Sequence, residues 1–307
     1  MLPTLREEAI HGNDLEGLVT ALPEGRLSTG IAGLDEVLGG GLPPRHMYWV
    51  EGRTGTGKTT LALQFVLEGA RHGESVLYIT LTETPDELRA AAASHGWSLD
   101  GVTIHELACE AGAADEDYTV FFPDEVELGR STRRIEEVVE RERPTRVVLD
   151  AMSELQLMAR DGFTHRRQLL GLRNLFRGRE CTVLALDERV SDGGDMELRS
   201  LAHGVIRLEQ QPLGYGGIRR WVRVVKLRGG AFRHGDQDLR IETHGLVVYP
   251  RLVATEHGRA DGDDPVSSGL PAVDALLGGG LRRGDSAVVA GPTGAGKSTL
   301  EIGRAHV

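Results

Sequence analysis

The chain has 307 residues, a formal net charge of −11 and 40% hydrophobic residues, values typical of a folded globular protein. No block of basic residues is present, which argues against nucleic-acid partners because these require a positive surface. The N-terminus lacks the apolar core of a signal peptide, and no stretch has the length of a membrane span. The two cysteines, Cys109 and Cys181, have no metal-binding spacing, so we expect reduced thiols in a cytoplasmic protein.

In chain order, a polar leader (1–20) precedes a series of apolar strands that alternate with amphipathic helices. The predicted strands are 46–52, 75–81, 145–150 and 181–188, and the predicted helices are 59–73, 84–96, 132–143 and 165–180. Thr84 with Glu87 three residues later predicts a capping box at the start of the second helix. Such alternation indicates an α/β fold with a mostly parallel sheet flanked by helices. From residue 204 onward the pattern changes, and 204–211, 219–230 and 246–250 predict added antiparallel strands.

The strongest motif is GRTGTGKT, from Gly52 to Thr59, which fits the P-loop pattern G-x-x-x-x-G-K-[ST]. Its glycines let backbone N–H groups, including those around Thr54, turn toward phosphate oxygens, and the following helix adds its positive N-terminal end. Lys58 is predicted to reach the β- and γ-phosphates, and the Thr59 hydroxyl to bind Mg²⁺. The sequence therefore predicts ATP and Mg²⁺ as cofactors.

Acidic and basic residues at other strand ends complete the predicted site. Asp150 ends the apolar strand RVVLD, where a carboxylate can hold the metal opposite Thr59; the alternative is an ordinary strand-end turn. Glu83 follows the strand before it and could orient or deprotonate the attacking water, or be a surface glutamate. Lys226 and Arg228, in KLRGG, could reach a neighbour's γ-phosphate if subunits form a ring. Taken alone, KLRGG predicts only a solvated strand edge.

The chain contains the P-loop twice. The segment 27–61 aligns without a gap to 266–300, including an S-[ST]-G turn, an aspartate, an LGGGL run and the loop GPTGAGKS. A self-match of this length predicts duplicated domains. We therefore expect a first domain at 21–250, a polar linker at 251–265 and the start of a truncated second domain at 266–300. The second nucleotide loop would use Gly291, Gly294, Gly296, Lys297 and Ser298.

After Leu300 only EIGRAHV remains, too little to supply the strands that a P-loop domain requires. These seven residues, 301–307, also equal the in-frame translation of a common sequencing adapter. We therefore expect them to be an artefact and the natural protein to continue. The alternative is a natural short tail.

Taken in order, LSTGIAGLDEVLGGGLP, the P-loop, TETPDELRAAAASHGW, RVVLD and KLRG resemble the KaiC and KaiC-like family of RecA-like P-loop ATPases. The resemblance implies a RecA-like core, tandem domains, and a hexameric ring with ATP between subunits. It also implies regulatory protein partners and a slow N-terminal ATPase, with autokinase activity, where present, in the C-terminal domain. Serine/threonine autokinase activity of the full-length protein, and a RecA/Rad51-like DNA-binding ATPase, remain as alternatives.

The resemblance also assigns residues by position. It assigns the nucleotide loop to Gly55, Thr56, Gly57, Lys58, Thr59 and Thr60, a segment flanking the nucleotide to Ser94, His95, Gly96 and Trp97, a nearby stretch to Thr243, His244 and Gly245, and the segment presented in trans to Lys226, Leu227 and Arg228.

The chain departs from the family pattern at positions that bear on its activity. Thr82 replaces the first of two adjacent glutamates, Ala151 replaces the serine after Asp150 (the Walker B aspartate), and Phe232 replaces a histidine after KLRG. These departures favour a divergent KaiC-like ATPase over a clock protein, and the first predicts very slow or absent hydrolysis if the missing glutamate is the base.

Overall fold

The structure is a computed structural model that describes residues 25–107, 123–157, 159, 161–188, 196–214, 216–252, 265–281 and 287–298, with the backbone alone for 123–128 and 196–198. The predicted leader, the predicted artefactual tail, Cys109 and all but the ends of the predicted linker lie outside these residues. The chain divides into two compact units, Met1–Arg251 and Leu252–Val307. No helix in the described part of the chain is long and apolar enough to cross a bilayer.

The first unit is built on a nine-stranded sheet with the order β3-β2-β4-β5-β1-β6-β7-β8-β9. Its parallel strands are β1 (Met47–Gly52), β2 (Val76–Thr80), β3 (Thr103–Glu106), β4 (Arg146–Asp150), β5 (Thr182–Glu188) and β6 (Gly204–Pro212). Antiparallel pairing then adds β7 (Ile218–Leu227), β8 (Gln237–Glu242) and β9 (Gly245–Tyr249). The expected α/β sheet with added antiparallel strands is confirmed, although β6 also pairs in parallel with β1 and β8 was not expected.

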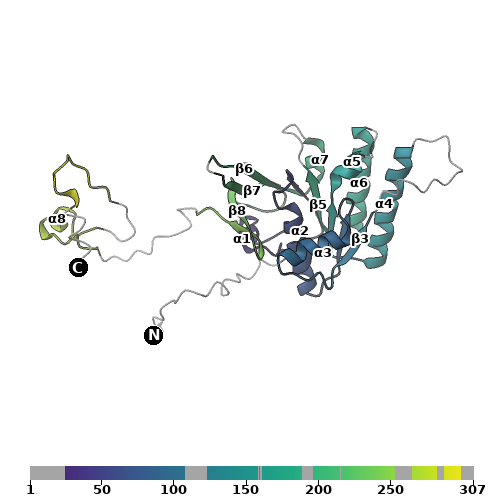
Figure 1. Cartoon of the computed structure of the whole chain (residues 1–307), viewed down its shortest axis with the longest axis horizontal. Coiled ribbons are helices and arrows are strands. Elements are labelled where there is room, and N and C mark those ends of the chain that lie inside the picture. The colour runs from purple at the N-terminus through teal and green to yellow at the C-terminus, as the bar shows by residue number, and fades with distance from the viewer. Residues whose placement is uncertain are drawn as a thin grey trace. The chain divides into compact units, whose positions relative to one another are not determined.

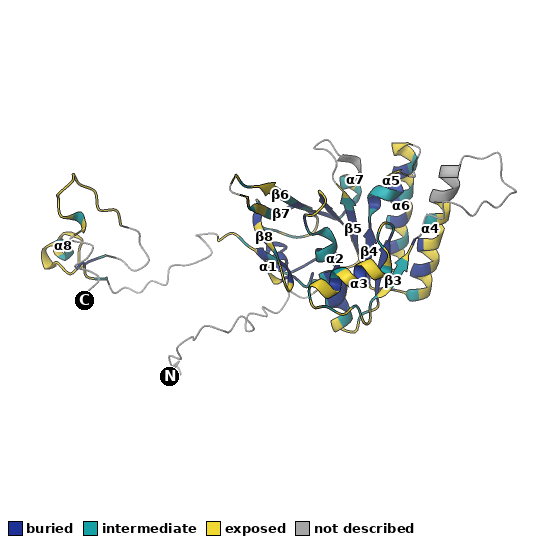
Figure 2. Cartoon of the chain, viewed as in Figure 1, coloured by how far each residue is buried: buried dark blue, intermediate teal, exposed yellow. Residues whose placement is uncertain are grey.

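Helices cover both faces of this sheet (Figure 1). They are α1 (Ala32–Val37), α2 (Lys58–Arg71), α3 (Pro85–Ser94), α4 (Pro123–Glu142), α5 (Met152–Leu157), α6 (Gly162–Gly178) and α7 (Met196–Leu201). Alternate residues along β1, β2, β4, β5 and β6 enter two separate cores, as period-two geometry requires. For example, Tyr48 and Val50 pack with α2, whereas Trp49 packs with α6. Figure 2 shows the buried strands in dark blue between helices whose outer faces are yellow.

Local sequence signals explain several element boundaries. The capping box is confirmed, because Thr84 accepts from the Glu87 N–H while the Glu87 carboxylate accepts from the Thr84 N–H. Asp161 caps α6 by accepting from the Thr164 N–H at 2.7 Å. The helix predicted to start at residue 165 begins earlier, because α6 already starts at Gly162, and His165 lies within it at 2% exposure.

Residues 27–42, which contain α1 and precede β1, form a closed loop that we call the arch. Leu27 and Leu42 form a two-hydrogen-bond bridge at its base, and the Asp35 carboxylate accepts from Ser28 Oγ, Thr29 N and Thr29 Oγ1 at 2.7–2.8 Å. Gly41 has φ +103°, and a Cβ there would lie 2.5 Å from the Leu27 carbonyl oxygen. The LGGGL run therefore contains glycine where the arch closes on itself.

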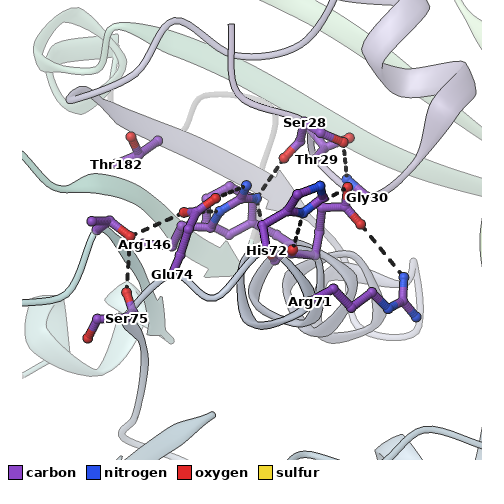
Figure 3. A network of polar contacts seen from close by, with 12 residues as sticks. Ser28, Thr29, Gly30, Arg71, His72, Glu74, Ser75, Arg146 and Thr182 are labelled. Carbon is purple, nitrogen blue, oxygen red and sulfur yellow. Dashed lines mark hydrogen bonds and ion pairs between the residues drawn. The ribbon is translucent and has the colours of Figure 1, made fainter. Parts of the chain in front are cut away.

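A buried guanidinium joins the arch to the sheet (Figure 3). Arg146, 2% exposed at the start of β4, donates from Nε and Nη2 to both oxygens of Glu74 at 2.8 Å. Its Nη1 donates to the Ser28 carbonyl at 2.7 Å and the Phe65 carbonyl at 3.1 Å. The ion pair lowers the pKa of Glu74. One side chain thus joins the arch, α2, the segment after α2 and β4.

We predict that Arg146→Met lowers the free energy of unfolding by about 3 kcal/mol, because it leaves a buried network without its cation. The matched control is Arg179→Met, whose exposed partner is Glu140 and which should cost under about 1 kcal/mol. Urea unfolding of both variants measures the difference. Equal losses would show that the Arg146 network does not stabilise the fold.

Candidate functional site

The first P-loop connects β1 to α2 at the carboxyl edge of the parallel strands. Gly55 and Gly57 have φ values of +78° and +102°, in the left-handed region that favours glycine. Lys58 Nζ donates to the Gly52 carbonyl at 2.8 Å and the Arg53 carbonyl at 3.1 Å. Burial lowers the pKa of Lys58, while neighbouring carboxylates oppose that shift. The lysine thus lies folded along the loop that it would use to hold phosphate.

The other threonines of the loop have distinct positions. Thr54 donates to Glu188, and its carbonyl accepts from Gln210 Nε2 at 3.1 Å. Thr56 is fully buried and donates to the Arg53 carbonyl at 2.8 Å. Thr60 is half-buried one residue after Thr59 on α2. Side chains from β5 and β6 thus support the loop from both neighbouring strands.

Asp150 lies beside the loop at the end of β4. Its Oδ2 accepts from Tyr78 OH at 2.6 Å and lies 3.5 Å from Thr59 Oγ1. Burial raises the pKa of Asp150, and the Tyr78 and Thr59 hydroxyls and the charge of Lys58 partly offset that rise. The two residues that the sequence predicts as metal ligands are therefore brought together, because β2, β4 and the P-loop share one edge.

Glu83 lies at the same edge, in the segment between β2 and α3. Thr80 Oγ1 donates to the Glu83 carbonyl at 2.7 Å and accepts from its N–H at 3.0 Å, which fixes the backbone of this residue. Burial and then the charge of Asp150 raise the pKa of Glu83. A half-buried carboxylate with a raised pKa has the proton affinity that a general base requires. Thr82 beside it is exposed.

The segment Ser94–Trp97 meets the β8–β9 turn. His95 Nδ1 lies 3.2 Å from the Glu242 carbonyl oxygen and 3.4 Å from that of Thr243, and Trp97 packs so close to Gly245 that a Cβ there would lie 2.4 Å from the ring. On β8, Ile241 approaches the loop, since a Cβ on Gly57 would lie 3.0 Å from its Cδ1. Segments widely separated in sequence, including Gly96 (φ +73°) and His244, therefore lie on one side of the P-loop.

Lys226 and Arg228 lie at the opposite edge of the sheet from the P-loop, level with the amino ends of the parallel strands. The Arg228 N–H donates to the His203 carbonyl, and the His203 N–H donates to the Met47 carbonyl at the first residue of β1. The P-loop begins at Gly52, the last residue of β1, which lies about 16 Å from the first along a strand of six residues. The structure therefore does not bring these two cations to the P-loop of their own chain.

With this geometry in place, residues 27–253 match the family described as "ATPase: KaiC". The chain belongs to the KaiC ATPase family. It is 28% identical over 279 residues to the circadian clock oscillator protein KaiC of Parasynechococcus marenigrum, an alignment that covers 90% of this chain and 54% of that protein. It is also 28% identical over 284 residues to the circadian clock protein KaiC3 of Synechocystis sp. PCC 6803, covering 90% and 55%.

Among solved structures, the crystal structure of the KaiC-like protein PH0186 from Pyrococcus horikoshii OT3 is similar, with a TM-score of 0.61 and 28% identity. The match covers 73% of this chain and 99% of that one. The mixed sheet is therefore the RecA-like core of the KaiC family. The chain spans about half the length of the curated relatives that it matches.

The described residues of the second KaiC-like segment form its local motifs but include no buried hydrophobic side chain. Its arch closes through a Val266–Leu281 bridge, and Asp274 accepts from Ser267 Oγ and Ser268 N as Asp35 does in the first copy. Helix α8 (Pro271–Leu276) follows the same pattern as α1 but has no buried residue. Leu276 is 87% and Val288 is 92% exposed, whereas their counterparts in the first copy, Val37 and Trp49, are buried.

The lysine of the second P-loop has the same contacts as the lysine of the first. Lys297 Nζ donates to the Gly291 and Pro292 carbonyls at 2.9 Å each. Gly294 and Gly296 have φ values of +85° and +81°, and Ser298 is exposed. The segment before the loop, 287–290, forms no strand. No Walker B counterpart lies beside Lys297 among the described residues of this unit.

Sequence reasoning missed several charged or polar residues at the site. Glu51, directly before the P-loop, is 3% exposed and accepts from Arg199 and Arg207 at 2.9 and 2.6 Å. Asp187 is the next-to-last residue of β5, and burial raises its pKa to about 6. An acidic residue at a strand end, the signal that identified Asp150, also marks Asp187. Nothing in the sequence marks Tyr78 as the donor to Asp150, since it lies within an apolar strand.

We predict that Tyr78→Phe raises the pKa of Asp150 further, because the carboxylate loses a charge-assisted hydrogen bond that favours its ionised form. Carboxyl carbon NMR titration measures this shift. Tyr48→Phe is the control, since its hydroxyl donates to the Pro43 carbonyl instead. An unchanged Asp150 titration in Tyr78→Phe would contradict the assignment.

Proposed function

We propose that this chain binds Mg·ATP at the first P-loop and hydrolyses it at interfaces between subunits of a homo-oligomeric ring, a hexamer as in the family pattern. The P-loop, Glu83 and Asp150 would come from one subunit, and Lys226 and Arg228 from the next. The observation that carries this proposal is that these two sets of residues lie at opposite edges of the sheet. The P-loop begins at the carboxyl end of β1, whereas Arg228 lies level with Met47 at the amino end of β1.

The residues at the P-loop edge fit a nucleotide with its metal. Thr59 and Asp150 offer one hydroxyl and one carboxylate, the hard oxygen ligands that Mg²⁺ takes alongside substrate phosphates. No group of three or more His, Cys, Asp or Glu side chains that could hold an ion alone occurs in the described part of the chain. A bound Mg²⁺ would neutralise charge on the phosphates.

In the proposed reaction, water attacks the γ-phosphorus, the bond to the β-γ bridging oxygen breaks, and ADP leaves with that oxygen. Glu83 accepts the proton of the water, which its raised pKa favours. Lys58 and the loop N–H groups hold the phosphates, while Arg228 of the neighbour offsets charge that develops on the transferred group. Because Thr82 replaces the family's first glutamate, we expect slow turnover.

We further propose that turnover serves a regulatory output acting through partner proteins. The two curated relatives named above are circadian clock proteins. The departures at Ala151 and Phe232 support a divergent KaiC-like ATPase over a clock component.

A mixing experiment tests the trans arrangement. Lys58→Ala chains and Arg228→Ala chains should each be inactive as pure rings, since a lost arginine finger can cost about 10³–10⁵-fold in rate. Mixed rings should recover activity at sites that pair an intact P-loop with an intact Arg228. A measurable parent rate with no recovery, despite demonstrated co-assembly, would place Arg228 in cis or give it a structural role.

The two P-loops provide a matched pair for the binding test. Lys58→Ala should weaken Mg·ATP binding on the order of 100-fold, because the phosphates lose a charge-assisted contact. Lys297→Ala should leave affinity unchanged, because the second loop lacks a supporting strand. Calorimetry should find about one tight site per chain. Two tight sites, or equal effects of the two substitutions, would reject this assignment.

A further inference from the structure

Helix α7 lies between two parts of the proposed site that belong to different ring interfaces. One is Glu51, the residue directly before the P-loop. The other is the KLRG segment at the end of β7, which the proposed function assigns to the neighbouring subunit's ATP. Contacts on α7 join the two within one chain.

Arg199 makes both contacts. Its side chain, 20% exposed, donates from Nε to Glu51 Oε2 at 2.9 Å, and its backbone carbonyl accepts from Lys226 Nζ at 2.8 Å. Glu51 keeps a second partner on β6, because Arg207 Nε donates to its other oxygen at 2.6 Å. The carboxylate is thus a buried anchor for α7 at the P-loop.

Lys226 uses all three of its N–H groups on the end of α7. Besides the Arg199 carbonyl, Nζ donates to the Ser200 carbonyl at 3.3 Å and the Ala202 carbonyl at 2.8 Å. An ammonium has three donors, so these contacts use its full capacity. A cation at a helix C-terminus also meets the negative end of the helix dipole.

Within the described part of the chain, the Arg228 side chain donates fewer hydrogen bonds than that of Lys226. Its Nη2 donates to the Ser200 carbonyl at 3.0 Å, and its backbone N–H to the His203 carbonyl. A guanidinium has five donors in a planar fork, and Ser200 occupies one of them. Of the two cations, Arg228 therefore has the donors to bind a phosphate, and Lys226 has the contacts that hold the segment in place.

We propose that Arg199 is a positioning residue for the arginine finger. Helix α7 joins Glu51 to Lys226 and fixes where Arg228 is presented to the next subunit. This inference rests on the proposed function, since it requires that Arg228 act in trans. From the sequence, we expected both Lys226 and Arg228 to contact the neighbour's phosphate. In this inference only Arg228 does so, and Lys226 acts by binding the end of α7.

The test is Arg199→Met, which keeps a long side chain and the backbone carbonyl but removes the charge. Pure rings should lose about 10- to 100-fold in kcat, the scale expected when a catalytic group is displaced by about 1 Å. The KM for ATP should stay within about twofold of the parent, because binding uses the same chain's P-loop. Arg199→Lys should restore part of the rate. Arg179→Met, which removes an exposed pair with Glu140, should match the parent.

Mixing assigns the defect to one side of the interface. Lys58→Ala chains supply a correctly positioned Arg228, and Arg199→Met chains supply an intact P-loop, so mixed rings should recover activity. Random equal mixing makes about a quarter of the interfaces complete. No recovery in proven mixed rings, a large rise in KM, or parent-like kcat in Arg199→Met would overturn the inference.

A parent-like rate in Arg228→Ala would instead remove the trans finger itself, and with it this part of the proposed function. If Arg199→Met does not fold, Glu51→Gln tests the same link from the other side, because Arg207 can still donate to the amide oxygen. It should lower kcat and be rescued by Lys58→Ala chains in the same way, and failure of that rescue would overturn the inference.

Discussion

Parallel pairing of β2, β4, β5 and β1 is the constraint on which the site depends. Parallel strands place their carboxyl ends at one edge, so the loops that follow them meet there. Asp150, Glu83 and the P-loop come from three such strand ends. Burial at this edge raises the pKa of both carboxyls and lowers that of Lys58. The same geometry that assembles the charges also adjusts their proton affinities.

The antiparallel strands have a different consequence. Because β7 runs against β6, its last residues return to the amino edge of the sheet, away from the P-loop of the same chain. A single chain therefore carries the two sets of proposed catalytic residues on opposite edges of the sheet. Ring assembly would join them, and the contacts of α7 with Glu51 and Lys226 would relate one interface to the next.

The duplicated segment separates local from global determinants of this fold. Both arches close through the same bridge and the same aspartate, and both P-loop lysines fold onto the same two carbonyls. Burial of the apolar side chains differs, since Val37 and Trp49 are core residues in the first copy and their counterparts Leu276 and Val288 are exposed in the second. Turn chemistry and left-handed glycines thus form these motifs in the second unit, where the described residues include no strand, whereas the environment that shifts the pKa of Asp150 requires a sheet.

The sequence alone determined the P-loop, the duplication, the alternating pattern of the sheet and the capping box at Thr84, because each depends on residue types at short spacing. It also marked Asp150 and Glu83 as acids at strand ends. Only the tertiary structure decided that Tyr78 donates to Asp150, that Glu51 anchors α7, and that Lys226 caps a helix that had not been predicted. These contacts join residues far apart in the chain, where periodicity carries no information about distance. By charge alone, Lys226 and Arg228 are equivalent candidates to contact the phosphate of a neighbouring subunit. Their different hydrogen bonds in the folded chain distinguish them.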